Sequence, residues 1–144
     1  MAFPYLTRKS AAVLLVRTDP SDSFCLSAED QERILKDYCA SLGVQVYQTI
    51  KLSCPETETI GQLDTILPSL PDRITAVIAV RIHRYTTFLE ELTQFCFKCK
   101  HLYNVELYSM EFGKPIRTLM VNLRNPYNPN ITWIDDEEEN TEIP

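Results

Sequence analysis

The sequence predicts a single α/β domain built on a small, doubly wound and mostly parallel sheet of four to five strands. Two observations predict this fold. Short apolar runs alternate along the chain with segments whose apolar residues recur at helical spacing. The runs Ala11 to Val16 and Ile74 to Val80 are continuously apolar, as strands buried on both faces of a parallel sheet are. Such alternation implies right-handed crossovers, which place helices on both faces of the sheet.

Length and composition are consistent with one domain. With 144 residues and 44% apolar side chains, the chain is long enough for one hydrophobic core and too short for two. We predict a folded domain over residues 1–124 and an irregular acidic tail over residues 125–144. No apolar segment reaches the roughly 18 residues of a membrane span, and Met1 to Lys9 lacks the apolar run of a signal peptide. We therefore expect a cytoplasmic protein with no membrane partner.

The first predicted helix carries signals at both of its ends. Ser27 followed by Asp30 resembles a capping box, and Gly43 stands where a helix C-terminus favours a residue with positive φ. Apolar residues between them recur at helical spacing: Ile34, Leu35, Tyr38, Cys39 and Leu42. Thr18 to Cys25, rich in Pro, Ser and Asp, is predicted to form turns between the first strand and this helix.

The same patterns predict the other elements. Three further strands are expected, namely Val44 to Leu52, Ile74 to Val80 and Val105 to Met110. Two further helices are expected, over Thr57 to Leu67 and over Tyr85 to Lys100.

The pattern changes after Met110. Lys114 to Leu123 has the composition of one more strand, which would be the fifth. Asn125 to Asn130 (NPYNPN) is predicted not to form regular structure, because Asn and Pro favour turns. The acidic segment after it is expected to be disordered.

The formal charge of −6 is concentrated at the end of the chain. Six of the 20 acidic residues lie in the last ten positions: Asp135, Asp136, Glu137, Glu138, Glu139 and Glu142. The remaining 14 acidic residues balance the 14 Lys and Arg residues, so the body is neutral. It lacks the basic surface of a typical autonomous DNA-binding protein, and any contact with DNA has to be local.

Five cysteines, an odd number in a chain of this size, are predicted to be reduced thiols. Cys96 and Cys99 form a CxxC near His101, which could be half of a zinc site. Both cysteines lie on the apolar stripe of a predicted helix, and no second pair completes a tetrahedral site, so we interpret them as core thiols. We expect no metal.

Motifs that hold a phosphate-bearing cofactor are excluded by the glycine content. P-loops and dinucleotide fingerprints need several glycines in one loop, whereas Gly43, Gly61 and Gly113 are the chain's three glycines and lie far apart. We expect no cofactor.

Arginines stand at the predicted carboxyl ends of two strands. Arg17 ends the first strand, and Arg81 and Arg84 follow the third. Open α/β sheets place their sites at this edge, and guanidinium groups that converge there would bind phosphate or carboxylate. The alternative is three separate, solvated arginines. His83 lies between two of them and could act as a general base, but no nucleophile pairs with it in the sequence.

The order of elements and several of these residues together resemble the catalytic domain of serine recombinases, the resolvase and invertase family, over roughly Ala11 to Met110. Three stretches carry the resemblance. The family's aromatic-x-Arg-x-Ser corresponds to Leu15-Val16-Arg17-Thr18-Asp19 in this chain. Its Ser-x-Glu-x-Gln corresponds to Ser27-Ala28-Glu29-Asp30-Gln31. Its Asp-Arg-Leu-Ser-Arg corresponds to Val80-Arg81-Ile82-His83-Arg84.

The resemblance implies a resolvase-like fold and a DNA-phosphate site at Arg17, Arg81 and Arg84, the positions that grip the scissile phosphate in the family. It also implies lost chemistry, because Asp19 stands where the family has its nucleophilic serine. If Ser53-Cys54 corresponds to the family's Ser-Gly pair, a further family arginine would fall near Thr59, and it is missing. Nothing after Met110 resembles the family's long dimerisation helix or a helix-turn-helix.

We therefore expect a recombinase-like domain without strand-exchange chemistry, whose partner is DNA or an active recombinase. Ser21 or Ser23 remains an alternative nucleophile if the loop folds back by one pleat. A second hypothesis is a protein-interaction module that contacts its partner through the acidic tail and Trp133. A third is a small-molecule enzyme, for which the sequence offers no matched acid, base and nucleophile.

Overall fold

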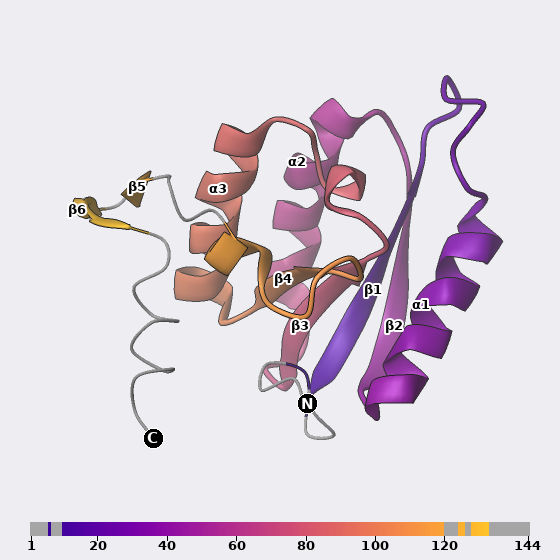
Figure 1. Ribbon diagram of the computed structural model, residues 1–144, viewed down its shortest axis with the longest axis horizontal. Helices are drawn as coiled ribbons and strands as arrows, with labels where there is room; N and C mark the ends of the chain where they lie inside the picture. The colour runs from indigo at the N-terminus through magenta and orange to yellow at the C-terminus, as the bar shows by residue number, and fades with distance from the viewer. Residues whose placement is uncertain (1–5, 7–9, 120–123, 126–127, 133–144) are drawn as a thin grey trace.

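The structure is a computed structural model, and it describes Leu6, Ser10 to Leu119, residues 124–125 and residues 128–132. Four parallel strands form the main sheet of these residues in the order β2-β1-β3-β4 (Figure 1). The strands are β1 (Ala11–Thr18), β2 (Gln45–Ser53), β3 (Ile74–Ala79) and β4 (Glu106–Ser109). The predicted α/β fold is confirmed.

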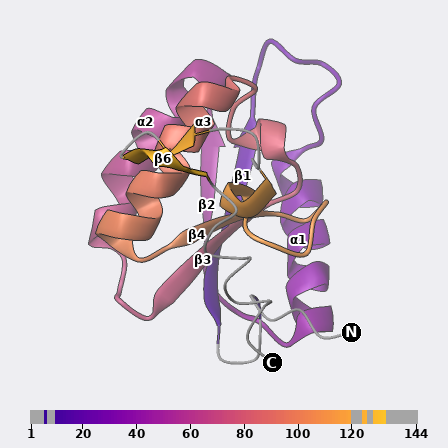
Figure 2. The same ribbon diagram turned by 60° about the vertical axis from the view of Figure 1, so that its left-hand side comes forward.

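Helices cover both faces of this sheet, as the alternating pattern predicts. Helix α1 (Ala28–Leu42) lies on one face, while α2 (Glu56–Ile66) and α3 (Leu89–Lys98) lie on the other (Figures 1 and 2). The central strand β1 is apolar at successive positions because it faces both layers. Leu14 packs with Leu35 of α1 on one side, and Leu15 packs in the core that contains Leu63 of α2 on the other.

Helix α1 is capped at both of the predicted residues, Ser27 and Gly43. The Ser27 hydroxyl accepts a hydrogen bond from the backbone N–H of Asp30 at 3.1 Å. At the other end Gly43 adopts φ 73°, and its N–H donates to the carbonyl of Ala40. The Ser27 cap fixes where α1 begins, and therefore how many residues the preceding loop contains.

The third helix begins later than the sequence predicts. The chain after β3 forms a 3₁₀ turn (Ile82–Arg84), and α3 starts at Leu89 rather than at Tyr85. The reason is the Tyr85 side chain, which is fully buried and whose hydroxyl lies 3.0 Å from the Val77 carbonyl and 2.8 Å from the Tyr108 carbonyl. A side chain anchored between two strands directs this segment across the sheet edge before the helix can begin.

The end of α3 agrees with the interpretation of the CxxC. The helix continues into a π-helical turn (Cys99–Tyr103) that ends at Asn104, which has φ 55°. Cys96 and Cys99 are both buried in the apolar core. His101 is exposed and stacks on Phe97 instead of approaching the two thiols.

The segment directly after β4 differs from its prediction. Where a fifth strand was expected, Ile116–Leu119 forms a 3₁₀ helix, and residues 120–123 lie outside the described residues. The turn is stabilised by the Thr118 hydroxyl, which donates to Pro115 at 2.7 Å, and by the ion pair of buried Arg117 with Glu106 at 2.8 Å. These contacts favour a compact turn over an extended strand.

The prediction that Asn125 to Asn130 lacks regular structure is also wrong for the residues described. Strand β5 (Arg124–Asn125) pairs with β6 (Asn128–Thr132) as a short antiparallel ribbon. Pro is tolerated in a strand that has a free edge, because the missing N–H then leaves no partner unsatisfied. Trp133 and the acidic residues that follow lie outside the described residues.

None of the helices in the described part of the chain has both the length and the apolar character needed to cross a bilayer.

Candidate anion site at the carboxyl edge of the sheet

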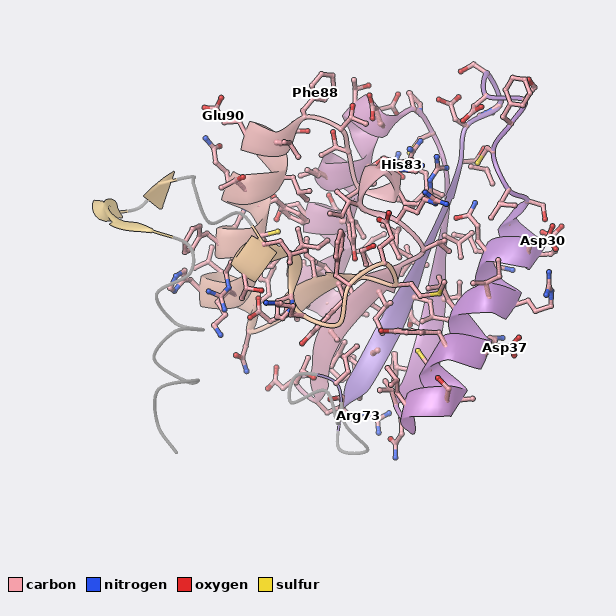
Figure 3. The ribbon with its side chains drawn as sticks, viewed as in Figure 1. Asp30, Asp37, Arg73, His83, Phe88 and Glu90 are labelled. Atoms are coloured by element: carbon pink, nitrogen blue, oxygen red, sulfur yellow. The ribbon has the colours of Figure 1, made fainter. Side chains whose placement is uncertain are left out.

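The loop after β1 and the turn after β3 meet at one end of the sheet. Both lie at the upper edge in Figure 1, where the parallel strands point their carboxyl ends. This edge carries all three arginines that the sequence singles out, and Figure 3 marks it by His83.

Arg17, at the end of β1, directs its guanidinium inward. The side chain is 3% exposed, and each of its three nitrogens donates to a backbone carbonyl. The acceptors are Arg84 at 3.0 Å from Nε, Cys54 at 3.0 Å from Nη1 and His83 at 3.1 Å from Nη2. Burial, followed by the neighbouring Arg84, lowers the pKa of Arg17. Arg17 thus joins β1 to the end of β2 and to the turn after β3.

Arg84 and Arg17 hydrogen bond to each other, and part of the Arg84 guanidinium has no acceptor among the described residues. It is 8% exposed, and its Nη1 donates to the Arg17 carbonyl at 2.9 Å and lies 2.9 Å from the Cys25 sulfur. In the described part of the chain, no acceptor binds the Nε or the Nη2 of Arg84. Every side-chain nitrogen that is fully buried in this part of the chain has a hydrogen-bond partner, so these two nitrogens are not fully buried. These two groups therefore retain access to solvent.

Gln31 fixes the loop against the end of β1. It is 1% exposed, and its Nε2 donates to the carbonyls of Arg17 at 2.9 Å and Leu26 at 2.8 Å. Its Oε1 accepts the Arg17 N–H at 3.3 Å. The sequence placed Gln31 in the Ser-x-Glu-x-Gln match, and the structure gives that position its physical reason.

Arg81 lies at the rim of the same edge. Its side chain is 62% exposed, and its nearest carboxylate is that of Glu111 after β4, at 3.9 Å. Glu111 is itself held by the N–H of Ile82 at 3.0 Å and the hydroxyl of Ser109 at 2.9 Å. The Arg81 guanidinium is therefore oriented by a loose ion pair and stays accessible to a ligand.

Asp19 and Ser21 bond to each other rather than to the arginines. The Asp19 Oδ1 accepts from the Ser21 N–H at 2.9 Å and from its hydroxyl at 2.7 Å. These two bonds, with smaller contributions from Arg17 and Arg84, lower the pKa of Asp19, so it is an anion at neutral pH. Ser21 and Ser23 are both exposed.

A cavity of about 490 Å³ opens at this edge. Its lining comes from the loop after β1, from α1 and from the turn after β3: Asp22, Phe24, Cys25, Leu26, Gln31, Val80, Arg81, His83 and Arg84. Burial, together with Arg84 and Arg81, lowers the pKa of His83 and keeps its imidazole neutral. The structure thus brings Arg81 and Arg84 together in one cavity, whereas Arg17, Asp19, Ser21 and Ser23 do not line it.

Sequence reasoning missed Cys25 and Phe24 as lining residues. Cys25 was counted only among the five thiols, and it is the partly exposed one, since the other four are buried. Phe24 carried no signal, because a single aromatic residue in a turn-rich loop has no pattern. A sequence rule that could have found both is their place in the first loop after a predicted central strand.

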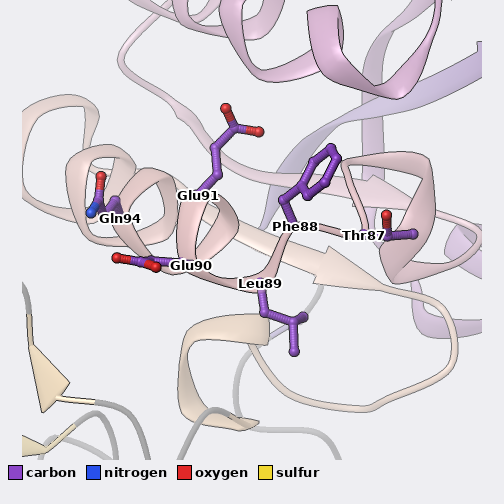
Figure 4. Close-up of a pocket in the computed structure, with 6 residues that line it drawn as sticks. All are labelled: Thr87, Phe88, Leu89, Glu90, Glu91 and Gln94. Carbon is purple, nitrogen blue, oxygen red and sulfur yellow. The ribbon is translucent and has the colours of Figure 1, made fainter.

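Two other cavities lack a cationic side chain in their described lining. One, of about 800 Å³, lies at the start of α3, where Figure 4 shows Phe88 and Leu89 beside the carboxylates Glu90 and Glu91. The other, of about 260 Å³, contains Asp72 and mostly apolar residues near the start of β3. Neither suits an anion.

The described residues contain no cluster of three or more His, Cys, Asp or Glu side chains that could hold a metal ion.

No protein-family model and no curated protein matches the chain. Solved structures do match it. The C-terminal catalytic domain of ISC1926 TnpA, an IS607-like serine recombinase, aligns with a TM-score of 0.53 at 19% identity, covering 69% of this chain and 68% of that one. The N-terminal catalytic domain of TP901-1 integrase aligns with a TM-score of 0.52 at 12% identity, covering 71% and 78%. The chain therefore has the resolvase-like fold of serine recombinase catalytic domains.

Proposed function

We propose that this domain binds DNA through a backbone phosphate at the cavity of Arg81 and Arg84, and that it does so without strand exchange. The observation that carries the proposal is that Arg84 and exposed Arg81 line one cavity at the carboxyl edge of the sheet, and that the Arg84 Nε and Nη2 have no acceptor among the described residues. The solved recombinase domains that share the fold make DNA the first ligand to test.

The buried contacts of Arg84 favour binding because they fix its guanidinium before a ligand arrives. A side chain already held by the Arg17 carbonyl loses little rotamer freedom on binding. Guanidinium forks also match the geometry of phosphate oxygens. Arg81 is freer, so it adds attraction and salt dependence more than precise orientation.

Strand exchange requires a nucleophile that attacks phosphorus and becomes covalently linked to it. The position that corresponds to the family serine is Asp19, whose negative charge repels phosphate. Ser21 donates its hydroxyl proton to Asp19 and lies outside the lining of the cavity. Binding without cutting is the behaviour that these residues support.

The test is fluorescence anisotropy of a labelled DNA duplex with Arg81→Glu. We expect its affinity to fall by about tenfold or more, with a shallower salt dependence by about one unit of slope. Arg33→Glu is the matched control, since Arg33 is an exposed arginine on α1 whose guanidinium pairs with Asp30, and the charge change is the same. Equal losses in both variants, or no binding by the parent chain, would contradict the proposal.

A second candidate function, a protein-interaction module, is favoured by exposed apolar side chains at the start of α3. Phe88 is 52% exposed and Leu89 is 57% exposed beside the sheet edge. Under this reading Phe88→Ala or deletion of residues 135–144 weakens association with a recombinase partner, while Arg81→Glu has no effect. Analytical ultracentrifugation of the mixed proteins separates the two functions.

A further inference from the structure

We propose that the cavity beside Arg84 accepts an unpaired nucleotide, whose phosphate contacts Arg81 and Arg84 and whose base stacks on Phe24. This inference rests on the proposed phosphate site and adds a preference for an unpaired base over duplex DNA. The juxtaposition that supports it is an almost fully exposed aromatic ring and two arginines in the lining of one cavity.

Phe24 is 96% exposed, although it lies in a loop with ordered turns. Its N–H donates to the Asp22 carboxylate at 3.0 Å, and the Cys25 N–H donates to the Asp22 carbonyl at 3.3 Å. The next residue, Cys25, is in contact with Arg84 through its sulfur at 2.9 Å. The backbone on either side of the ring is therefore held, while the ring itself has no apolar neighbour to cover it.

The lining divides into an apolar and a cationic part. Phe24, Leu26 and Val80 supply apolar surface, and Arg81 and Arg84 supply charge. A nucleotide presents the same two characters, a flat apolar base face and an anionic phosphate. The volume of about 490 Å³ falls in the range of roughly 300–1,000 Å³ that is typical of small-ligand sites.

A paired base cannot use this surface. In duplex DNA both faces of each base are covered by stacking, so a base reaches Phe24 only when it is unpaired or turned out of the helix. The amide of Gln31 in the lining is already engaged by the carbonyls of Arg17 and Leu26, so it adds no readout of base edges. Binding should therefore tolerate any base sequence.

One acidic residue of the lining opposes the phosphate. Asp22 carries a negative charge in the same cavity, and its Oδ1 is used by the Phe24 N–H. Asp22→Asn keeps that acceptor and removes the charge. We expect this variant to bind nucleotide several-fold more tightly, an effect opposite to that of Arg81→Glu.

The direct test is anisotropy of labelled oligothymidylate of about 12 nucleotides, compared with a duplex of the same length. Phe24→Ala should weaken single-strand binding by about tenfold, since base stacking on an aromatic side chain contributes on that scale, and should leave duplex binding unchanged. Phe24→Tyr should restore it. Phe88→Ala is the matched control, because Phe88 is exposed outside this cavity.

Cys25 provides a second readout that does not depend on a labelled ligand. It is the partly exposed one of the five thiols, and it lines the cavity. Oligothymidylate should protect Cys25 from a maleimide in the parent chain and protect it much less in Phe24→Ala. Inorganic phosphate, run as the control, should protect both proteins equally.

The outcomes separate the two levels of the proposal. If Phe24→Ala binds oligothymidylate as the parent does, the nucleotide inference is wrong, and the phosphate site survives provided that Arg81→Glu still weakens duplex binding. If Arg81→Glu changes neither ligand, the phosphate site itself is wrong. If thymidine monophosphate protects Cys25 to the same extent as the oligomer, the occupant is a free nucleotide. If the oligomer alone protects Cys25, the occupant is a single strand.

Discussion

Arg17 and Arg81 lie at the same edge of the sheet but differ in burial and in hydrogen-bond partners. Arg17 is buried, with three carbonyl acceptors for its three nitrogens, whereas Arg81 is exposed and has one loose carboxylate neighbour. Hydrogen bonds from a charged donor in a buried site contribute more to stability than ion pairs at the surface. Stability measurements can therefore separate the two residues before any ligand is known.

The first prediction concerns folding stability. Arg17→Ala should lower the free energy of unfolding by about 3 kcal/mol, because it leaves buried carbonyls without their donor. Arg81→Ala should change it by less than about 0.5 kcal/mol. Urea denaturation followed by circular dichroism measures both, and similar losses in the two variants would refute this assignment of roles.

The second prediction concerns the thiols. Cys39, Cys54, Cys96 and Cys99 are buried, and burial raises the pKa of Cys39 to about 11. Ellman's reagent should therefore titrate one thiol quickly in the native protein and all five after denaturation. Cys25→Ser should abolish the fast phase. Two or more fast thiols would show that the core around at least one of the four buried cysteines is less closed than described.

At the scale of elements, α1 connects the site to the rest of the fold. Gln31 holds the loop after β1, and one residue later Glu32 ties the helix to β2. Its carboxylate accepts the Thr49 hydroxyl at 2.6 Å and pairs with Lys51 at 3.2 Å and Lys36 at 3.3 Å. The hydrogen bond from Thr49, with those from the two lysines, lowers the pKa of Glu32 to about 2.

The third prediction follows from that shift. A carboxylate whose pKa falls from 4.5 to about 2 on folding stabilises the native state above pH 4.5, and this contribution is lost as the pH falls towards 2. Glu32→Gln should therefore be less stable than the parent at neutral pH and approach it in acid. Denaturant midpoints measured across this range test the idea. A gap between the two proteins that stays constant with pH would exclude it.

Strands and caps were the elements that the sequence predicted well, and the reason is local. Continuous apolar runs specify β1 and β3, while Ser27 and Gly43 specify the ends of α1 through their own backbone contacts. The start of α3 was missed because Tyr85 is anchored by carbonyls of β3 and β4, which lie 8 and 23 residues away in the sequence. The short β5–β6 ribbon was missed because pairing can overcome a composition that favours turns.

The site was predicted only in part for the same reason. Arg81 and Arg84 lie three residues apart in one turn, and strand order, which the sequence pattern contains, brings that turn beside the end of β1. The inward direction of Arg17 depends on carbonyls of Cys54, His83 and Arg84, whose positions only the folded chain defines. Whether three arginines in a motif are ligands or structural groups is decided by such acceptors.

The whole molecule carries a neutral body with a local cationic cavity, so the DNA binding that we propose should be modest in affinity and sensitive to salt. The resolvase-like fold supplies the edge on which this cavity is built, and the fold itself does not fix a function. The function therefore depends on the side chains at that edge, among them Arg81 and Arg84.

The full chain should neither nick nor recombine supercoiled plasmid, because Asp19 offers no hydroxyl for attack on phosphorus. Gel electrophoresis under denaturing conditions would reveal both nicks and covalent protein–DNA adducts. If either product forms, the chain is an enzyme after all, and Ser21→Ala with Ser23→Ala would show whether a loop serine is responsible.

The most direct test of the central claim is an NMR titration of the protein with inorganic phosphate, following side-chain and backbone signals of Arg17, Cys25, Arg81 and Arg84. We expect saturable shifts of the Arg84 Nε–H, the Arg81 Nε–H and the Cys25 amide, with the buried Arg17 Nε–H almost unchanged. Shifts scattered over exposed lysines and arginines such as Arg33, with none at Arg84, would contradict a phosphate site at this edge.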